Sequence, residues 1–420
     1  MFSHEGMITK PVDIAIIGGG AAGLATAIFT KRLMPARSVV LLDGTKKLGA
    51  KILVSGGGRC NVTNCVVTPH DFSGGNPNVI KRVLTALPVS RTVAFFREIG
   101  VDLYEEEHGK LFPTDDRART VLEAMIGEAT RLGVQICPNH RVTQLLRESD
   151  AFQVTTLPRP LTARNVVLAT GGQSLPKTGS DGFGYGLATA LGHTLIPLTP
   201  ALVALVLDGG FHVPLSGISH EVELTVEAAD LKTARANGVL LWTHFGISGP
   251  VTLDISRHWH RARLEHRTVS LLANLLRHAD APTVESKLLD IGSAQPRIQL
   301  SNALAKLLPS RLADAALTEL RIDGTTPMAH LPRDVRRNVA KALVRWRLPV
   351  RDSRGYSHAE VTAGGVPFAE VESRTLQSRV CPGLYFTGEI LDVDGRIGGF
   401  NFQWAWSSAW VVATALARAS

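Results

Sequence analysis

The sequence predicts an α/β protein, and three observations near its start support that class. Residues Val12 to Ile17 form a short apolar run typical of a buried strand, and the glycine-rich segment GGGAAG follows at once. A helical pattern then runs from Ala21 to about Leu33, and Pro35 cannot continue it. A second apolar run, Val39 to Leu42, ends at Asp43. Strand, turn, helix and strand in this order form one βαβ unit, which indicates an α/β fold with a parallel sheet.

The glycines of that turn match the dinucleotide-binding pattern GxGxxG. Gly18 permits the tight turn, Gly20 lets the backbone approach a diphosphate, and Gly23 lets the helix and strand pack closely. The N–H groups at the start of the helix can then hold the diphosphate. Asp43 follows Gly23 by about 20 residues, where an acidic side chain is expected to bind ribose hydroxyls. A Rossmann-like domain is therefore expected, although the pattern does not distinguish FAD from NAD.

The pattern changes after this first domain. Prolines cluster after Ile196, and alternating segments such as Glu221 to Val226 predict an antiparallel sheet. The chain is helix-rich and charged from about Arg261 to Arg347, and one more apolar strand, Leu384 to Thr387, precedes the final helix. We therefore expect a nucleotide-binding domain formed by residues 1–195 and 357–420, a β-rich inserted domain formed by 196–260 and 348–356, and a helical insertion at 261–347.

Composition narrows the function classes. The net charge is +8, but lysine and arginine are scattered and form no basic run that contains aromatics, so no nucleic acid partner is expected. The four cysteines form no zinc-spaced cluster with histidine, so no metal site is expected. The first residues lack the regions of a signal peptide, and polar residues interrupt the apolar stretch Phe400 to Ala417. We expect a cytoplasmic protein without membrane contact, in which that stretch is a buried helix.

Three further stretches carry a resemblance to a known family. They are LGAKILVSGGGRCNVTN at Leu48 to Asn64, ATGGQSLPKTGSDGFGY at Ala169 to Tyr185, and GLYFTGEILDVDGRIGGFNFQWAWSS at Gly383 to Ser408. Together with the glycine turn they resemble the HI0933-like flavoproteins, whose members include proteins labelled aminoacetone oxidase or BaiN-like. The segments Thr243 to Pro250 and Val361 to Val366 also fit that family, whereas the helix-rich middle matches nothing assignable.

The resemblance implies a fold and a cofactor. It implies one FAD per chain, held by a Rossmann-like FAD-binding domain of the two-dinucleotide-binding type. It also implies an inserted β-rich, barrel-like domain, a small helical domain and no separate NAD(P)-binding domain. No second strand–GxGxxG–helix unit is present in the sequence, in agreement with this expectation.

Several of these stretches offer backbone groups to the cofactor. The SGGGRCN stretch presents successive N–H groups at Gly56, Gly57 and Gly58, which can form a nest for the diphosphate and ribityl chain of FAD. The ATGG stretch follows a buried strand and can pass close to the adenosine half. Glu389, in TGE at a strand end, is expected to bind ribityl or ribose hydroxyls, with Asp394 as a second candidate.

The GGFNFQ stretch opens the last helix. Gly398 and Gly399 would let backbone N–H groups face the N1/C2=O edge of the flavin, where the helix N-terminus stabilises the charge of reduced flavin by about 0.3–2 kcal/mol. Trp404 and Trp406 are expected in the core. The expected FAD contacts are Gly18, Gly20, Ala21, Ala22, Gly23, Asp43, Gly44, Lys51, Ser55, Gly56, Gly57, Gly58, Arg59, Cys60, Asn61, Val142, Ala169, Thr170, Gly171, Gly172, Gly388, Glu389, Asp394, Gly398, Gly399, Phe400, Asn401 and Gln403.

The expected function is that of a FAD-dependent oxidoreductase, which transfers a hydride between a small organic substrate and flavin N5. Oxidation of an amine or ketone and reduction of an activated double bond both remain open, as does the electron partner, oxygen or NAD(P)H. Four residues are candidates for the chemistry. His244 is a candidate acid or base, because histidine as a residue type serves in general acid–base catalysis. Arg396 and Arg59 could hold a carboxylate, and Cys60 lies in the glycine-rich loop.

Two alternatives remain at this stage. Cys60 and Cys65 form a C-x4-C pattern, which would suit an NAD(P)H-dependent disulfide reductase. That class needs a second nucleotide fingerprint and a C-terminal histidine, and no histidine follows His358. The net charge suggests the other alternative, a flavin-bearing RNA-binding protein.

Overall fold

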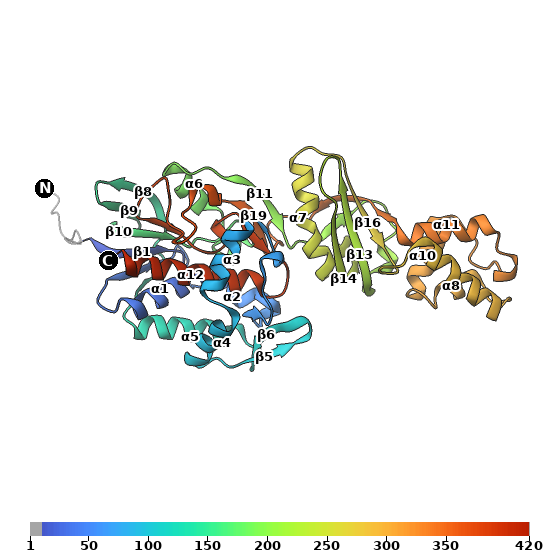
Figure 1. Ribbon diagram of the computed structural model, residues 1–420, viewed down its shortest axis with the longest axis horizontal. Helices are drawn as coiled ribbons and strands as arrows, with labels where there is room; N and C mark the ends of the chain where they lie inside the picture. Colours follow the sequence, from blue (N-terminus) through green and yellow to red (C-terminus); the bar gives the residue numbers. More distant parts are fainter. Residues whose placement is uncertain (1–10, 420) are drawn as a thin grey trace. The chain divides into compact units, whose positions relative to one another are not determined.

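The computed structural model describes residues 11–419, and its contacts divide the chain into two compact units (Figure 1). Unit 1 contains the chain up to Pro200 and again from Glu360 onward, and unit 2 contains Ala201–Ala359. Each unit has a hydrophobic core of its own. Both ends of the sequence therefore build one unit.

The centre of unit 1 is a seven-stranded sheet, and the α/β class is confirmed. Parallel pairing joins the first βαβ unit to two later strands, whereas β8 and β9 continue the sheet in antiparallel fashion. The order is β7 (Gln135–Cys137), β2 (Val39–Leu42), β1 (Val12–Ile17), β10 (Leu161–Leu168), β9 (Ala151–Thr156) and β8 (Val142–Glu148), with β20 (Leu384–Phe386) also paired to β10. The register sets Ile17 beside Leu42 and Leu168, so three strands end together at one edge.

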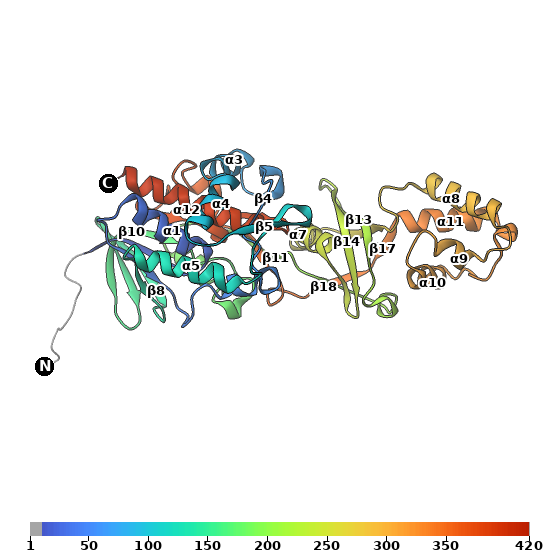
Figure 2. The ribbon, with the colours of Figure 1, turned by 90° about the horizontal axis from the view of Figure 1, so that it is seen from below.

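Two long helices pack against each other beside this sheet. They are α1 (Ala21–Leu33) and the last helix, α12 (Phe400–Arg418), which lie side by side in both views (Figures 1 and 2). The rings of Phe29 and Trp410 meet edge to face across this contact, with centroids 5.3 Å apart. Trp404 and Trp406 are buried, as expected. Among the described helices none is long and apolar enough to cross a membrane.

Short elements of unit 1 carry the motif stretches. The sheet β3–β6–β5 comprises Thr63–Asn64, Lys110–Pro113 and Leu103–Glu106, and the pair β21–β4 comprises Val393–Gly395 and Phe72–Gly74. The short 3-10 helix η1 (Ser55–Gly58) carries the glycine-rich loop. The remaining α-helices and strands of unit 1 are α2 (Ala50–Val54), α3 (Pro77–Ala86), α4 (Val89–Glu98), α5 (Ala118–Arg131), α6 (Phe183–Ala190), β11 (Ile196–Ala201) and β19 (Val361–Gly365).

Unit 2 contains a seven-stranded antiparallel sheet and a group of helices. The strand order is β17 (Trp346–Leu348), β16 (Val269–Asn274), β13 (Ser219–Ala228), β14 (Ala234–Thr243), β15 (Gly246–Ser248), β12 (Leu205–Leu207) and β18 (Val350–Ser353). Helix α7 (Pro250–Leu264) packs on β13 and β14. The helical segment follows with α8 (Ala281–Ala294), α9 (Leu300–Leu304), α10 (Ser310–Glu319) and α11 (Arg333–Val344). The range 261–347, predicted from the sequence as a helical insertion, also contains strand β16. The apolar run VSLLAN of this strand pairs with β13.

Candidate cofactor site

The glycine turn between β1 and α1 has three glycines with different roles. Gly18 has φ +107, and a Cβ there would lie 2.4 Å from the carbonyl oxygen of Ala169. A Cβ on Gly23 would lie 1.8 Å from the Gly18 carbonyl oxygen. A Cβ on Gly20 would meet nothing within 4 Å. Gly18 and Gly23 are therefore required by packing, whereas Gly20 borders open space, as the close approach of a diphosphate requires.

Hydrogen bonds to the Asp43 carboxylate link this turn to the end of β2. Its Oδ2 accepts a hydrogen bond from the Gly19 N–H at 2.7 Å, and its Oδ1 accepts one from the Thr45 N–H at 2.7 Å. Oδ1 also accepts from the Thr45 hydroxyl at 2.6 Å, so the free lone pair that can accept a ribose hydroxyl is on Oδ2. Gly44 lies against Arg141, next to the buried Val142.

The SGGGR loop has the backbone of a nest. Gly56, Gly57 and Gly58 have φ values of +55, +69 and +88, a region that favours glycine, and all three are exposed. Gly57 borders open space, because a Cβ there would meet nothing within 4 Å. The Ser55 hydroxyl donates to the Ile52 carbonyl at 2.7 Å and so ends α2. The loop can present its N–H groups to an anion, and its contact with the FAD diphosphate stays a prediction.

Arg59 is directed toward protein carboxylates. Its guanidinium forms an ion pair with Glu106, lies 3.5 Å from Asp116, and covers the ring of Phe112 at 4.1 Å. The hydrogen bond to Glu106 raises the pKa of Arg59, and the same bond lowers the pKa of Glu106. Arg59 stays a predicted contact of FAD or of a substrate carboxylate, and in the structure its guanidinium is paired with two carboxylates of the protein.

Cys60 and Cys65 do not have the electrostatics of a redox pair. Cys60 is fully buried, and burial raises the pKa of its thiol to about 12. Burial, followed by a hydrogen bond with Glu105, also raises the pKa of the Cys65 thiol. Reactive cysteines need a lowered pKa, since the thiolate is the nucleophile. The structure thus gives Cys60 no thiolate for catalysis and counts against the disulfide-reductase alternative.

Lys51 and Glu389 form the centre of a polar network that joins four motif stretches. The Lys51 Nζ donates to Glu389 Oε2 at 2.7 Å and to the Ser174 hydroxyl at 2.8 Å. Glu389 Oε1 accepts from the Thr362 N–H at 2.8 Å and from the Ser174 hydroxyl at 3.1 Å. Both side chains were expected to contact FAD, and that contact stays a prediction beside the bond between them. Ser174 and Thr362 were not predicted as site residues, although both lie in stretches that resemble the family.

The ATGG stretch contains polar groups that the protein leaves unsatisfied. The hydroxyls of Thr170 and Ser180 are buried without a hydrogen-bond partner among the described residues. Gly171 has φ +71, and a Cβ on it would lie 3.0 Å from the Ser180 hydroxyl oxygen. Hydroxyls without a protein partner can bond to a ligand or to water. Ser180 was not expected from the sequence, because nothing in its local pattern separates it from a loop serine.

The N-terminus of α12 meets the end of the SGGGRCN stretch. Gly399 has φ +93, and a Cβ there would lie 2.5 Å from the Thr63 carbonyl oxygen. The Asn64 side chain donates to the Gly398 carbonyl at 3.2 Å. The Asn61 Oδ1 atom, beside Gly399, is buried and has no partner among the described residues. The first N–H groups of α12 have no partners within the helix, and they give its N-terminus a partial positive charge. This helix end therefore lies beside the unsatisfied side-chain oxygen of Asn61.

Three expected contacts near this corner have side chains engaged within the protein. Gln403 is buried, its Oε1 accepts from the Thr63 hydroxyl at 2.7 Å, and its Nε2 donates to the Leu87 carbonyl at 2.9 Å. The Asn401 amide bonds both the N–H and the carbonyl of Gly395, each at 2.8 Å. Asp394 is buried within β21. The Gln403 and Asn401 side chains therefore hold neighbouring segments of unit 1 together, and their contact with FAD stays a prediction.

The remaining catalytic candidates lie in different units. Arg396 donates from Nε to Asp71 Oδ1 at 2.7 Å, and its guanidinium covers the Phe400 ring at 4.2 Å. Its side chain is half exposed, at 50%. His244 belongs to unit 2, where it follows β14 directly and is exposed. Its role stays a prediction.

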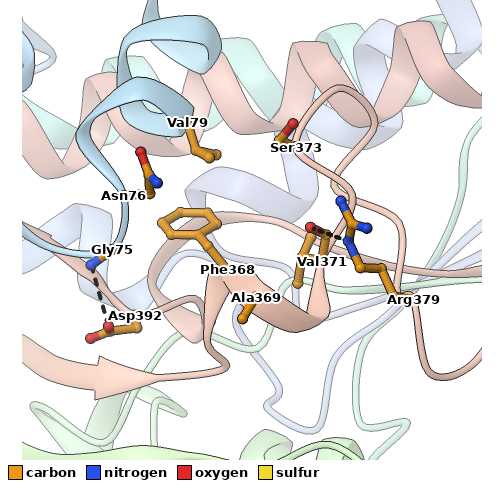
Figure 3. Close-up of a pocket in the computed structure, with 9 residues that line it drawn as sticks. All are labelled: Gly75, Asn76, Val79, Phe368, Ala369, Val371, Ser373, Arg379 and Asp392. Carbon is orange, nitrogen blue, oxygen red and sulfur yellow. Dashed lines mark hydrogen bonds between the residues drawn. The ribbon is translucent and has the colours of Figure 1, made fainter.

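A separate cavity of about 480 Å³ lies on unit 1 (Figure 3). Phe368 forms its floor, and the close-up shows Asp392 bonded to the Gly75 N–H at 3.3 Å and Arg379 bonded to the Val371 carbonyl at 3.2 Å. The volume suits a small ligand. The Asp392 carboxylate and the Arg379 guanidinium already bond to backbone groups of other residues, so the cavity offers a ligand few free contacts. No sequence motif indicated this cavity. It is lined by Gly75, Asn76, Val79, Phe368, Ala369, Val371, Ser373, Arg379 and Asp392.

The residues of unit 1 fit FAD. Open space borders Gly20 and Gly57, a helix N-terminus opens at Gly399, and three buried polar atoms await partners: Asn61 Oδ1, Thr170 Oγ1 and Ser180 Oγ. In the part of the chain that the structure describes, no group of three or more His, Cys, Asp or Glu side chains could hold a metal ion. The fold and the site thus define a Rossmann-type FAD-binding flavoprotein.

Comparison with known proteins identifies the family. The chain belongs to the HI0933-like family, because the model of the HI0933-like protein Rossmann domain matches residues 12–415. Two proteins named ribosomal RNA dihydrouridine synthase, from Escherichia coli (strain K12) and Haemophilus influenzae (strain Rd), are 36% and 35% identical to it. The matches cover 97% and 96% of this chain and 98% of each relative. The protein is a FAD-dependent oxidoreductase.

Other similarities are to proteins with different names. A 3-dehydro-bile acid delta(4,6)-reductase from Clostridium scindens is 32% identical over 405 residues, which cover 96% of this chain and 99% of that protein. Among solved structures, a 3-ketosteroid delta1-dehydrogenase from Sterolibacterium denitrificans superposes with a TM-score of 0.52 at 13% identity, covering 98% of this chain and 100% of that one. At that identity the likeness is one of fold.

Proposed function

We propose that this protein uses reduced FAD to saturate a carbon–carbon double bond conjugated with a carbonyl group, and that its substrate is a uracil ring in RNA. The observation that carries the proposal is that its differently named relatives point to one reaction. Dihydrouridine is uridine in which a ring double bond conjugated with a carbonyl has gained two hydrogens. A 3-oxo steroid with delta(4,6) unsaturation has the same kind of conjugated bond.

The site has groups suited to this chemistry. FAD, when bound and in its reduced form, supplies the hydride. The N-terminus of α12 at Gly399 would stabilise the negative charge that reduced flavin carries. Addition of hydride to one carbon of the conjugated bond places negative charge on the substrate carbonyl, so a donor is needed there. A proton from solvent then adds to the other carbon and completes the gain of two hydrogens. We assign this role to Arg396, which bonds Asp71 through Nε and has further N–H groups on a half-exposed guanidinium.

RNA is favoured over a steroid for two reasons. The two relatives named as dihydrouridine synthases are 36% and 35% identical to the chain, against 32% for the bile acid reductase. The net charge of +8 also favours association with a polyanion. The sequence-based expectation was that no nucleic acid partner exists. That expectation remains untested, and the proposal departs from it.

A single-turnover experiment tests the proposal. The purified holoprotein is reduced with light in the absence of oxygen and then mixed with a ribosomal RNA transcript or with a 3-oxo delta(4,6) steroid. Recovery of the absorbance of oxidised flavin follows the electron transfer, and mass spectrometry detects two hydrogens added to the substrate. The matched controls are the same RNA already converted to dihydrouridine and the saturated steroid.

The outcomes are distinct. We expect reoxidation by the uridine-containing RNA and none by the dihydrouridine control. If only the steroid reoxidises the flavin, the reaction class is retained and the RNA substrate is overturned. If neither unsaturated compound accepts the electrons, the whole proposal is overturned.

A further inference from the structure

Helix α11 of unit 2 has a regular row of positive side chains. Arg333, Arg337 and Lys341 follow one another in steps of four residues, and Arg345 continues the spacing at the end of the helix. All four are exposed. Steps of four keep side chains on one side of a helix and separate them by about 6 Å along its axis. We call these four residues the cationic stripe.

The opposite side of α11 fixes the direction in which the stripe faces. Val339, Ala340 and Leu343 are buried in the core of unit 2, and the helix packs against α8, which lies beside it in Figure 2. This apolar contact holds α11 in one rotational setting. The stripe is therefore a stable feature of the surface of unit 2.

The protein's own carboxylates neutralise only part of the stripe. Arg337 lies 3.3 Å from Glu285, and Arg345 lies 2.7 Å from Glu227. Such exposed pairs contribute about 0–1 kcal/mol and can be exchanged for another anion. Within the described residues Arg333 and Lys341 form no ion pair. The stripe thus offers positive charge that the fold does not use.

We propose that the cationic stripe binds the phosphate backbone of the RNA whose uracil is reduced in unit 1, an inference that rests on the proposed function. A linear polyanion suits a linear set of cations, because arginine and lysine each neutralise one phosphate and release counterions. Such contacts position a nucleic acid without reading its sequence. The stripe supplies affinity and placement of the RNA, and it takes no part in hydride transfer.

Salt-dependent binding of the FAD-loaded full chain to a fluorescent ribosomal RNA transcript tests the inference. The stripe variant is the triple substitution Arg333→Gln, Arg337→Gln and Lys341→Gln. The control variant, Arg297→Gln, Lys306→Gln and Arg321→Gln, removes the same charge from exposed positions of the same helical segment. We expect the stripe variant to lose tenfold or more in affinity at about 0.1 M salt, and to have a log–log salt slope shallower by about 2 to 3. The control should stay within about twofold of the wild type.

Companion measurements separate the possible failures. FAD content and the melting temperature should match the wild type, because α11 lies outside the cofactor unit and its buried face is unchanged. Equal RNA binding by the stripe variant, with uridine reduction by the wild type intact, overturns this inference alone. Absence of RNA binding by the wild type at about 0.05 M salt overturns the inference together with the RNA substrate. The steroid arm of the flavin experiment then decides whether the reaction class survives.

Discussion

The ammonium group of Lys51 lies 2.7 Å from Oε2 of Glu389, although 338 positions separate the two residues in the sequence. Ser174 bonds to both, and the Thr362 N–H bonds to the same carboxylate. The pair therefore ties the stretch before the SGGGR loop to the end of β20 and to two further motifs. Because its side chains are only 27% and 17% exposed, water weakens it less than a surface pair.

Removal of either partner of this pair should destabilise unit 1. Lys51→Met and Glu389→Gln each leave a half-buried polar network incomplete, and we expect each to lower the free energy of unfolding by about 1–3 kcal/mol. A double-mutant cycle should give a coupling of about 1–2 kcal/mol between them. The control pair is Arg119–Glu123, which is 3.8 Å apart and 75% and 67% exposed, and which should show no measurable coupling. Additive effects of Lys51→Met and Glu389→Gln would contradict the assigned contact.

Substitution of Arg396 should separate binding of the cofactor from reduction of the substrate. Arg396→Gln removes the charge assigned to the substrate carbonyl and keeps a side chain that can bond Asp71. We expect the rate of flavin reoxidation by the substrate to fall about 10²–10³-fold, a loss typical of one donor to a developing oxyanion. FAD affinity should not change, and Arg379→Gln, at the separate cavity, is the control. An unchanged rate would remove Arg396 from the proposed mechanism.

The two neighbouring cysteines should be dispensable for redox chemistry. With a pKa of about 12, Cys60 has almost no thiolate near neutral pH and should resist thiol reagents in the folded protein. Cys65→Ser should keep full single-turnover activity. A disulfide between these residues during turnover, or loss of activity in Cys65→Ser, would revive the disulfide-reductase alternative.

Acid should destabilise unit 2 through a buried histidine. Burial lowers the pKa of His220 to about 4, and neither of its ring nitrogens has a partner among the described residues. The unfolded chain takes up this proton near pH 6.5, so the contribution of His220 is fully present above about pH 6.5 and is lost as pH falls toward 4. We expect His220→Phe to lose less stability than the wild type across this window in urea titrations. The exposed His266 provides the control, as His266→Phe, and an identical pH profile for His220→Phe would contradict the assignment.

The glycines of the candidate FAD site were predictable from the sequence, because the constraints on them are local. Gly18, Gly23 and Gly399 are needed because of backbone conformation and close packing, and these constraints leave a glycine in the sequence itself. The buried helix α12 was equally visible, since polar residues interrupt its apolar run. The α/β class followed from the order of the first elements.

The partners of polar side chains were not predictable in the same way. Arg59 and Gln403 lie in motif stretches, but their partners Glu106 and Thr63 are 47 and 340 positions away. A motif reveals which residues gather at a site, and only the tertiary fold decides whether a side chain faces a ligand or the protein. For the same reason the bond between Lys51 and Glu389 was not predictable, and the contact of each with FAD stays a prediction.

The central claim is that backbone amides next to glycine form the FAD cradle, and titration of the apoprotein of Gly20→Ala with FAD tests it most directly. The added Cβ meets no protein atom within 4 Å, and Gly20 has φ −81, which alanine adopts freely. The account predicts that stability of the apoprotein changes by less than about 1 kcal/mol, while the dissociation constant of FAD rises by tenfold or more. Wild-type affinity for FAD in a folded Gly20→Ala protein would contradict the account.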